Sequence, residues 1–413
     1  MIEGPQAMTD TIQMLLQQRA SDSSVAVKYH GLQWTWRQYL AESAARAAAL
    51  IAAADPGRPL HIGALLGNTP EMLAQMAAAG LGGYVLCGLN TTRRGEALAA
   101  DIRKSDCQIV VTDAEHRDLL HGLGLAGTRI LDTATPQWAE LVAAAGPLVP
   151  HRKVNITDPF MMIFTSGTSG SPKAVQVSQL MPIFAGRRLT DRFALTVQDT
   201  CYVSMPLFHS NAVVAGWAPA VVSGAAIAPA KFSATNFLAD VRRYHATYMN
   251  YVGKPLAYIL ATPQREDDAD NPLRVAFGNE ANEKDIEEFA RRFAVQVEDG
   301  FGSTENAVIV IREPGTPPGS IGKGAPESRF TTARPSPSAP SRASTSAVPC
   351  STPTRPWANW STRPDRASST AITTTPTPTP NGCATACIGP VTSATATPKA
   401  GSIWRAAPAT GCG

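Results

Sequence analysis

The chain changes character near residue 326, and this change limits what it can fold into. Up to Pro326, short apolar runs alternate with amphipathic stretches that carry charged residues. From Glu327 to Gly413 the acidic residues shrink to two, and Thr, Pro, Ser, Ala and Arg fill the segment, which includes the tract TTTPTPTP. Such a composition cannot bury enough apolar surface to form a core. A folded core is therefore expected only within residues 1–326.

The first part has the alternating pattern of an α/β protein. Its apolar runs predict four buried strands. These runs are His61–Gly67, Tyr84–Asn90, Gln108–Asp113 and Phe160–Gly167. Between them, Thr35 followed by Gln38 predicts a capping box that opens a helix through Ala54, and Thr69 before Pro70 predicts a second helix start. Strands that alternate with helices indicate a largely parallel sheet.

Charge and cysteine usage exclude several classes of protein. With 36 Lys and Arg against 33 Asp and Glu, the net charge of +3 gives no basic field for nucleic acid. The start, MIEGPQAMTDTIQ, lacks the order of a secretory signal, so the seven cysteines are interpreted as cytoplasmic thiols. The longest apolar run, Ala212–Ala230, is rich in Ala and Gly and contains Pro219, which favours buried core over a transmembrane span.

Three interpretations of residues 327–413 follow from composition: a disordered linker, a glycosylated stalk, or translation in the wrong reading frame. The missing secretory signal argues against a stalk. The genetic code tests the third. If the last base of each codon is read with the first two of the next, Cys387–Gly413 permits a sequence that begins Tyr-Trp-Ser-Gly-Asp-Leu-Gly-Tyr, which is typical of a folded protein. We therefore expect a frameshift near Pro326 and no domain in the tail.

A loop rich in hydroxyl groups and glycine follows the last predicted strand. Residues Thr165–Ala174 read TSGTSGSPKA. Glycines let backbone N–H groups approach an anion, hydroxyls add donors, and Lys173 adds a neutralising charge, so the loop suits a polyphosphate. It is not a Walker loop, because Pro172 precedes the lysine and Ala174 follows it. An ordinary Gly/Ser surface loop is the alternative.

This loop resembles the phosphate loop of the adenylate-forming superfamily of acyl-CoA synthetases, with Ala174 in place of the family's glycine. Two more motifs follow in the family's order: MPLFHSNA at Met205–Ala212 and DGFGSTEN at Asp299–Asn306. LNTTRRGEAL at Leu89–Leu98 is similar to the fatty-acid-transport and very-long-chain branch. The resemblance spans about residues 9–326 and implies the N-terminal AMP-binding core, built of stacked α/β subdomains.

The resemblance also implies a role for each motif. The loop would hold the β- and γ-phosphates of ATP through Thr165, Ser166, Gly167, Thr168, Ser169, Gly170 and Lys173. His209 would border the acyl pocket; its alternative is a satisfied core histidine. The backbone of Gly278, Asn279 and Glu280 would frame the adenine.

In the last motif, Gly300, Phe301, Gly302 and Ser303 would contact the nucleotide, while Thr304 and Glu305 would contact phosphate and Mg²⁺. Phe301 stands where the family usually has tyrosine, so stacking on adenine is kept and the hydroxyl is lost. A hard cation that bridges phosphates needs a carboxylate such as Glu305. The alternative for Glu305 is a solvated loop charge.

The implied reaction has two steps: a fatty acid and ATP give acyl-adenylate and pyrophosphate, and coenzyme A then gives the acyl-CoA and AMP. The family also uses a ribose-binding aspartate, a hinge, and a mobile C-terminal domain with a catalytic lysine. The aspartate and hinge occur only in the recovered frame, at the codons of Val391-Thr392 and Ala406–Thr410. We therefore expect this chain to be impaired or inactive.

Several alternatives stay open. The chain could be a fatty acyl-AMP ligase or a non-catalytic remnant of a frameshifted gene, and within the family the motifs also allow a peptide-synthetase adenylation domain or a luciferase-like oxygenase. Acyl chain length, oligomeric state and peripheral membrane contact do not follow from the motifs.

Overall fold

A computed structural model of the protein describes residues 10–165, 172–302, 309–311 and 323–324, with side chains up to residue 300. All of these residues belong to one compact unit, Met1–Thr362. The expected tail, residues 327–413, lies outside the described residues.

One sheet has six strands in the order β6-β5-β3-β4-β7-β8. They are β3 (His61–Leu65), β4 (Val85–Gly88), β5 (Ile109–Thr112), β6 (Arg129–Asp132), β7 (Pro159–Thr165) and β8 (Lys173–Ser178). Neighbours run parallel except β7 and β8, which form an antiparallel pair. Four of these strands fall on the apolar runs singled out in the sequence, so the prediction of a largely parallel α/β sheet is confirmed.

The second sheet has nine strands in the order β15-β14-β13-β12-β11-β9-β10-β1-β2. They are β1 (Val25–Tyr29), β2 (Leu32–Thr35), β9 (Thr200–Val203), β10 (Ala226–Pro229), β11 (Tyr248–Val252), β12 (Val275–Asn279), β13 (Gln296–Gly302), β14 (Ile309–Ile311) and β15 (Lys323–Gly324). The strands from β13 to β1 in this order are parallel, and antiparallel strands close both edges. Their carboxyl ends therefore share one edge.

Helices connect the strands and cover both sheets. They are α1 (Ile12–Gln18), α2 (Trp36–Ala53), α3 (Pro70–Gly82), α4 (Gly95–Lys104), the 3₁₀ helix η1 (Arg117–Leu120), α5 (Pro136–Ala143), α6 (Leu180–Phe193), the π-helix η2 (Ala212–Trp217), α7 (Ala218–Ser223), α8 (Phe237–Tyr244), α9 (Pro255–Leu260) and α10 (Glu283–Phe293). The predicted capping box is present at α2, where Thr35 and Gln38 bond reciprocally. Helix α3 starts at Thr69 and Pro70 as predicted.

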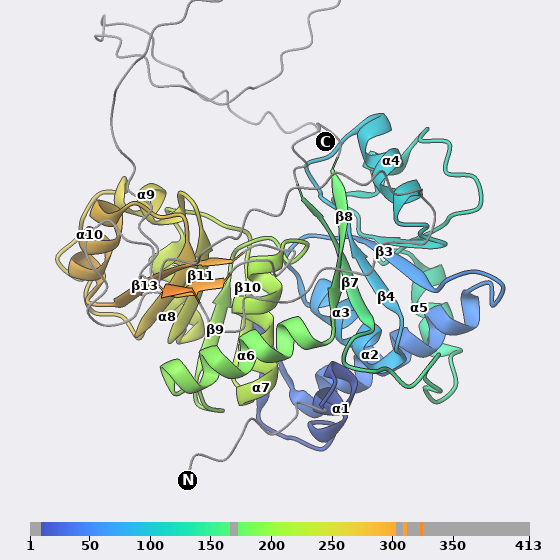
Figure 1. Ribbon diagram of the computed structural model, residues 1–413, viewed down its shortest axis with the longest axis horizontal. Helices are drawn as coiled ribbons and strands as arrows, with labels where there is room; N and C mark the ends of the chain where they lie inside the picture. The colour runs from blue at the N-terminus through green and yellow to red at the C-terminus, as the bar shows by residue number, and fades with distance from the viewer. Residues whose placement is uncertain (1–9, 166–171, 303–308, 312–322, 325–413) are drawn as a thin grey trace, which may run out of the picture. The chain divides into compact units, whose positions relative to one another are not determined.

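Alternate residues of the nine-stranded sheet face two different hydrophobic clusters. Cys201, Val203 and Tyr248 point into one cluster, whereas Tyr202 and Met249 point into the other. Helices α8, α9 and α10 cover the second face, as Figure 1 shows. Burial of both faces explains why the central strands β9, β10 and β11 carry apolar side chains on both faces.

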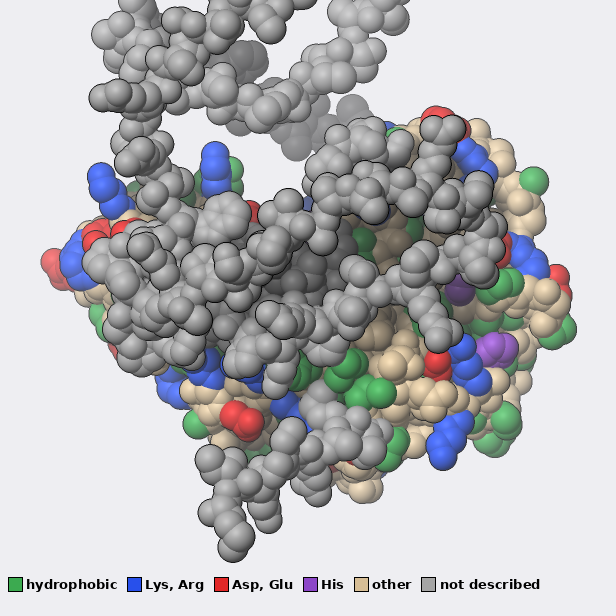
Figure 2. Space-filling model, viewed as in Figure 1, with side chains coloured by type: hydrophobic (Ala, Val, Ile, Leu, Met, Phe, Trp, Pro, Cys, Tyr) green, Lys and Arg blue, Asp and Glu red, His purple; other side chains and the backbone are tan. Residues whose placement is uncertain are grey.

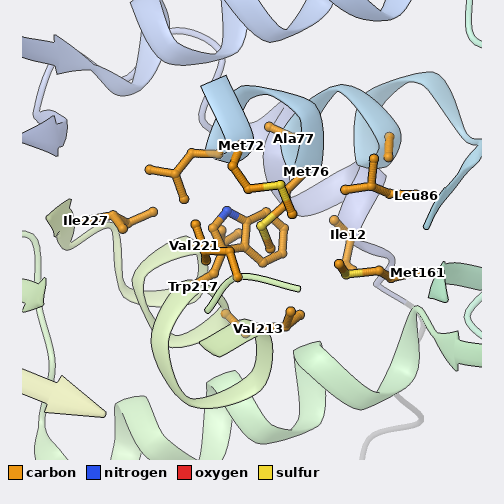
Figure 3. Packing of buried hydrophobic residues seen from close by; sticks show 14 of the residues in the cluster. Ile12, Met72, Met76, Ala77, Leu86, Met161, Val213, Trp217, Val221 and Ile227 are labelled. Carbon is orange, nitrogen blue, oxygen red and sulfur yellow. The ribbon is translucent and has the colours of Figure 1, made fainter. Parts of the chain in front are cut away.

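The larger cluster joins the two sheets. Figure 3 shows Met72 and Met76 of α3 beside Trp217 and Val213 of η2, with the Trp217 indole at the centre. The Trp217 ring stacks on Phe160 of β7 with centroids 5.6 Å apart and an interplanar angle of 13°. Trp217 therefore connects η2 to the six-stranded sheet, within a cluster that also contains Val203 and Ile227 of the nine-stranded sheet.

The apolar run Ala212–Ala230 forms η2, α7 and β10, and nearly all of it is buried. The prediction of buried core for this run is confirmed. Within the described parts of the chain, no helix is both long and apolar enough to cross a bilayer.

Charged side chains of both signs lie interspersed on the face shown in Figure 2. Ion pairs occur among the described residues: Arg192 Nε lies 2.5 Å from Glu298 Oε2, and Arg242 Nη1 lies 2.9 Å from Asp267 Oδ2. Exposed pairs of this kind add little to stability, so the fold depends on its apolar clusters.

Replacing Trp217 by alanine tests this dependence. Because the indole is fully buried between the sheets, we expect Trp217→Ala to lower the free energy of unfolding by about 3–5 kcal/mol. Urea denaturation followed by circular dichroism measures the loss. The control is Tyr258→Ala on the exposed face of α9, expected to cost about 0.5 kcal/mol or less. Equal losses for the two variants would contradict the central role of Trp217.

Candidate functional site

Two sequence motifs on the neighbouring strands β12 and β13 meet at the carboxyl edge of the nine-stranded sheet. Gly278, in the predicted adenine segment, pairs with Asp299 of the DGFGSTEN motif across β12 and β13. Asp299 Oδ2 accepts hydrogen bonds from the backbone N–H of Ala281 (3.0 Å) and the hydroxyl of Tyr251 (3.1 Å). Asp299 therefore fixes the two motifs relative to each other.

Gly278–Glu280, the segment predicted to frame the adenine, has a backbone conformation that restricts which residues can stand there. A Cβ at Gly278 would lie 2.2 Å from the carbonyl oxygen of Tyr251, so a larger residue would push the two strands apart. Glu280 has a φ of +68°, a left-handed conformation that is uncommon outside glycine. Such backbone geometry tends to persist at functional sites, because the surrounding contacts hold it there.

The predicted phosphate loop is flanked by the antiparallel strands β7 and β8. Thr165 at the end of β7 pairs with Lys173 at the start of β8, so the two ends of the loop are held together. Lys104, at the end of α4, donates a hydrogen bond to the carbonyl of Pro172. Ser166, Gly167, Thr168, Ser169 and Gly170 lie outside the described residues. Strand β8 was not predicted from the sequence.

Asn68 anchors the MPLFHSNA segment and was missed in the sequence. Its Nδ2 donates to the carbonyls of Val203 (3.1 Å) and Met205 (2.7 Å), and its Oδ1 accepts from the N–H of Leu207 (2.9 Å). Asn68 precedes α3, whereas the segment follows β9 in the other sheet. One carboxamide thus fixes the chain that leads to His209.

His209 keeps an exposed face, while protein packs around the rest of its ring. The Phe208 ring lies 4.7 Å from it, measured between centroids. This partial desolvation disfavours the imidazolium and lowers the pKa of His209. In its neutral form the imidazole can donate a hydrogen bond from one nitrogen and accept one at the other. This differs from a satisfied core histidine.

A cleft of about 960 Å³ with mixed polar and apolar walls opens beside this segment, lined by residues that follow strands of both sheets. Lys231 and Glu115 form a 3.0 Å ion pair from opposite sides. On its wall, His116 Nδ1 lies 2.6 Å from Asp113 Oδ1. Burial alone would raise the pKa of Asp113, but its hydrogen bonds with His116 outweigh burial and lower that pKa. Thr165, Lys173, Gly278, Asn279 and Glu280, described residues predicted to contact the nucleotide, are not part of the lining of this cleft.

The rest of the last motif is described only in part. Gly300 is buried within β13, and Phe301 and Gly302 complete that strand. Ser303, Thr304 and Glu305 lie outside the described residues. Among the residues that are described, no three His, Cys, Asp or Glu side chains gather as a metal site would require.

Sequence comparison assigns the class of protein. The pattern of the AMP-binding enzyme family matches residues 16–332, and the chain belongs to this family. It is 48% identical over 320 residues to the medium/long-chain-fatty-acid–CoA ligase FadD17 of Mycobacterium marinum, a match that covers 76% of this chain and 61% of the relative. It is 42% identical over 322 residues to the steroid-22-oyl-CoA synthetase of Rhodococcus jostii, covering 77% of this chain and 58% of that protein.

The chain thus spans about 60% of the length of the curated relatives it matches. Structure comparison confirms the fold. The anthranilate CoA ligase AuaEII superposes with a TM-score of 0.70 at 18% identity, over 78% of this chain and 65% of that one. A long-chain-fatty-acid CoA ligase from Rhodopseudomonas palustris superposes with a TM-score of 0.66 at 22% identity, covering 77% of this chain and 82% of that one.

The lowered pKa of His209 predicts a pH dependence. We expect its imidazole to titrate below 6.5, the ordinary value, in a histidine NMR titration. Between the folded pKa and 6.5 the unfolded chain binds a proton that the folded chain does not, so stability falls as pH drops below about 6.5. His209→Gln should remove this contribution to the slope. A His209 pKa at or above that of the urea-unfolded chain would contradict the assignment.

Proposed function

We propose that the chain derives from a fatty-acid–CoA ligase that activates a fatty acid with ATP and transfers the acyl group to coenzyme A. The meeting of the adenine segment with the DGFGSTEN motif at Asp299 is the observation that carries this proposal. Relatives of about 50% identity named as fatty-acid–CoA ligases support it.

Each step needs positioning and charge neutralisation more than a nucleophilic side chain. In the first, the carboxylate oxygen of the acid bonds to the α-phosphorus of ATP, and pyrophosphate leaves. Thr165, the hydroxyls and N–H groups of residues 166–170, and Lys173 bind the β- and γ-phosphates. The Gly278–Glu280 backbone frames the adenine, and Phe301 stacks on it.

The second step joins the thiol sulfur of coenzyme A to the acyl carbon, and AMP leaves. His209 borders the acyl pocket as a neutral ring. Thr304 would contact phosphate, and the Glu305 carboxylate would hold a Mg²⁺ bound with ATP, because a hard cation prefers oxygen ligands. Such an ion would supply positive charge beside the phosphates.

The acid substrate is a fatty acid by similarity to FadD17. A second candidate is a steroid carboxylic acid, because the chain is 42% identical to a protein named steroid-22-oyl-CoA synthetase. Rates with the two acids distinguish these candidates.

We also place the protein in the cytoplasm, since Cys87, Cys107 and Cys201 are buried free thiols, as expected in a reducing compartment.

We propose further that residues 327–413 are an out-of-frame translation. The match to the family ends at residue 332, close to the change of composition at Glu327. The ribose-binding aspartate and the hinge would then exist only in the other frame. The alternatives are a fatty acyl-AMP ligase and a non-catalytic remnant.

Replacing Lys173 tests the function. In the frame-corrected protein we expect Lys173→Ala or Glu305→Ala to slow pyrophosphate release by about 10² to 10³, because each removes a group that stabilises the developing phosphate charge. Lys284→Ala, at an exposed position of α10, is the matched control and should keep full activity. The uncorrected chain should turn over far more slowly. Full activity of Glu305→Ala, or equal turnover by the uncorrected chain, would overturn these assignments.

The reading frame has a direct test. Sequencing of the gene should reveal a one-base change of register between the codons of Gly324 and Ser328, because the other frame restores ordinary globular sequence. An unbroken frame, shared by close relatives that carry the same Thr/Pro tail, would refute the frameshift.

A further inference from the structure

Three asparagines from separate elements meet beside the proposed nucleotide site. Asn250 lies on β11, Asn279 is the last residue of β12, and Asn211 immediately precedes η2. Asn250 Nδ2 donates to Asn211 Oδ1 (2.7 Å), and Asn211 Nδ2 donates to Asn279 Oδ1 (2.9 Å). A chain of side-chain amides therefore runs from the core to the adenine segment.

A backbone carbonyl fixes how the amide groups of these asparagines are oriented. Asn211 Nδ2 also donates to the carbonyl oxygen of Tyr251 (3.2 Å), which can only accept. The nitrogen of Asn211 must therefore face Tyr251 and Asn279, and its oxygen must face Asn250. Because Asn279 accepts through Oδ1, its NH₂ group is left on the outer side.

Asn250 occupies a buried position that is unfavourable for a polar side chain. The side chain is fully buried, and its Oδ1 has no hydrogen-bond partner among the described residues. Gly216 and Val203 pack together there: a Cβ on Gly216 would lie 3.0 Å from both Asn250 Oδ1 and Val203. An unpartnered buried oxygen lowers stability, and leucine of similar size would avoid that loss. Unlike leucine, however, Asn250 donates a hydrogen bond to Asn211.

At the outer end of the row of asparagines, the Asn279 NH₂ group has no acceptor among the described residues. Asn279 is partly exposed, and its Nδ2 bonds to no described residue. The backbone around it is held firmly, since its carbonyl accepts from the N–H of Gly253 (2.8 Å) and Glu280 follows with a φ of +68°. The amide is therefore held at the site with its hydrogens available.

We propose that the Asn279 amide donates a hydrogen bond to an acceptor on the AMP part of the bound nucleotide, with Asn211 and Asn250 as positioning residues that hold it in this orientation. This inference rests on the proposed function for the ligand and on the structure for the chain of asparagines. It gives the Asn279 side chain a role beyond that of its backbone.

Calorimetric titration of the full 413-residue chain with AMP tests the ligand contact. Asn279→Asp keeps the shape but removes the donor and adds a negative charge, so AMP affinity should fall by at least about tenfold. Asn250→Leu should lower it about two- to tenfold through loss of orientation. The matched control is Gln75→Met in α3. Gln75 is also a fully buried amide with one donated bond and an unpartnered oxygen.

The control should leave AMP affinity unchanged. Unchanged affinity in Asn279→Asp, or equal losses in Asn250→Leu and Gln75→Met, would overturn the proposal. If the unaltered chain binds no AMP, the proposed function fails, and the role of Asn279 as a ligand contact fails with it.

Thermal unfolding tests the chain of asparagines without any ligand. Asn250 and Asn279 are connected through Asn211, so the changes in Tm of Asn250→Leu and Asn279→Ala should not add in the double variant. In an Asn211→Ala background they should add. Additive changes in both backgrounds would overturn the chain of asparagines whatever the binding data show.

Discussion

The structure depends on one buried tryptophan that belongs to neither sheet. Trp217 ends the π-helix η2, stacks on Phe160 of the six-stranded sheet, and donates its indole N–H to the Tyr39 hydroxyl (3.2 Å). Tyr39 in turn donates to the carbonyl of Leu73 in α3 (2.7 Å). Because η2 follows directly after His209 and Asn211, these contacts also set where the proposed acyl side of the site lies. A π-helix at this point agrees with the tendency of such turns to occur at functional sites.

Close approach of backbone segments is the second constraint. A Cβ at Gly88 of β4 would lie 3.0 Å from the Cα of Phe208, so glycine lets the MPLFHSNA segment lie against the six-stranded sheet. Gly278 has the same role against Tyr251 in the other sheet. At both motifs, the backbone can take its position only because a glycine leaves room for the neighbouring segment. Substitution at either glycine would displace the motif without removing any proposed contact.

The sequence predicted the elements whose formation depends on neighbouring residues alone. The strands β3, β4, β5 and β7 are apolar runs, and α2 and α3 start at side-chain caps, so a short window contains the whole signal. Asn68 gave no such signal, because it contacts Val203 across 135 residues of chain. The role of Asp299 likewise depends on strand register. The assignment of site residues from the motifs stays a prediction, whereas the contacts that hold the described ones could be found only from the fold.

The fold of the described residues draws on one part of this chain. The described hydrophobic clusters are built from residues between Ile12 and Val295, and the last described strand, β15, ends at Gly324. The change of composition begins at Glu327, after these core residues. A change of reading frame there would leave the described core and the Asp299 contacts in place. The fold of the described residues therefore does not depend on the sequence that follows Glu327.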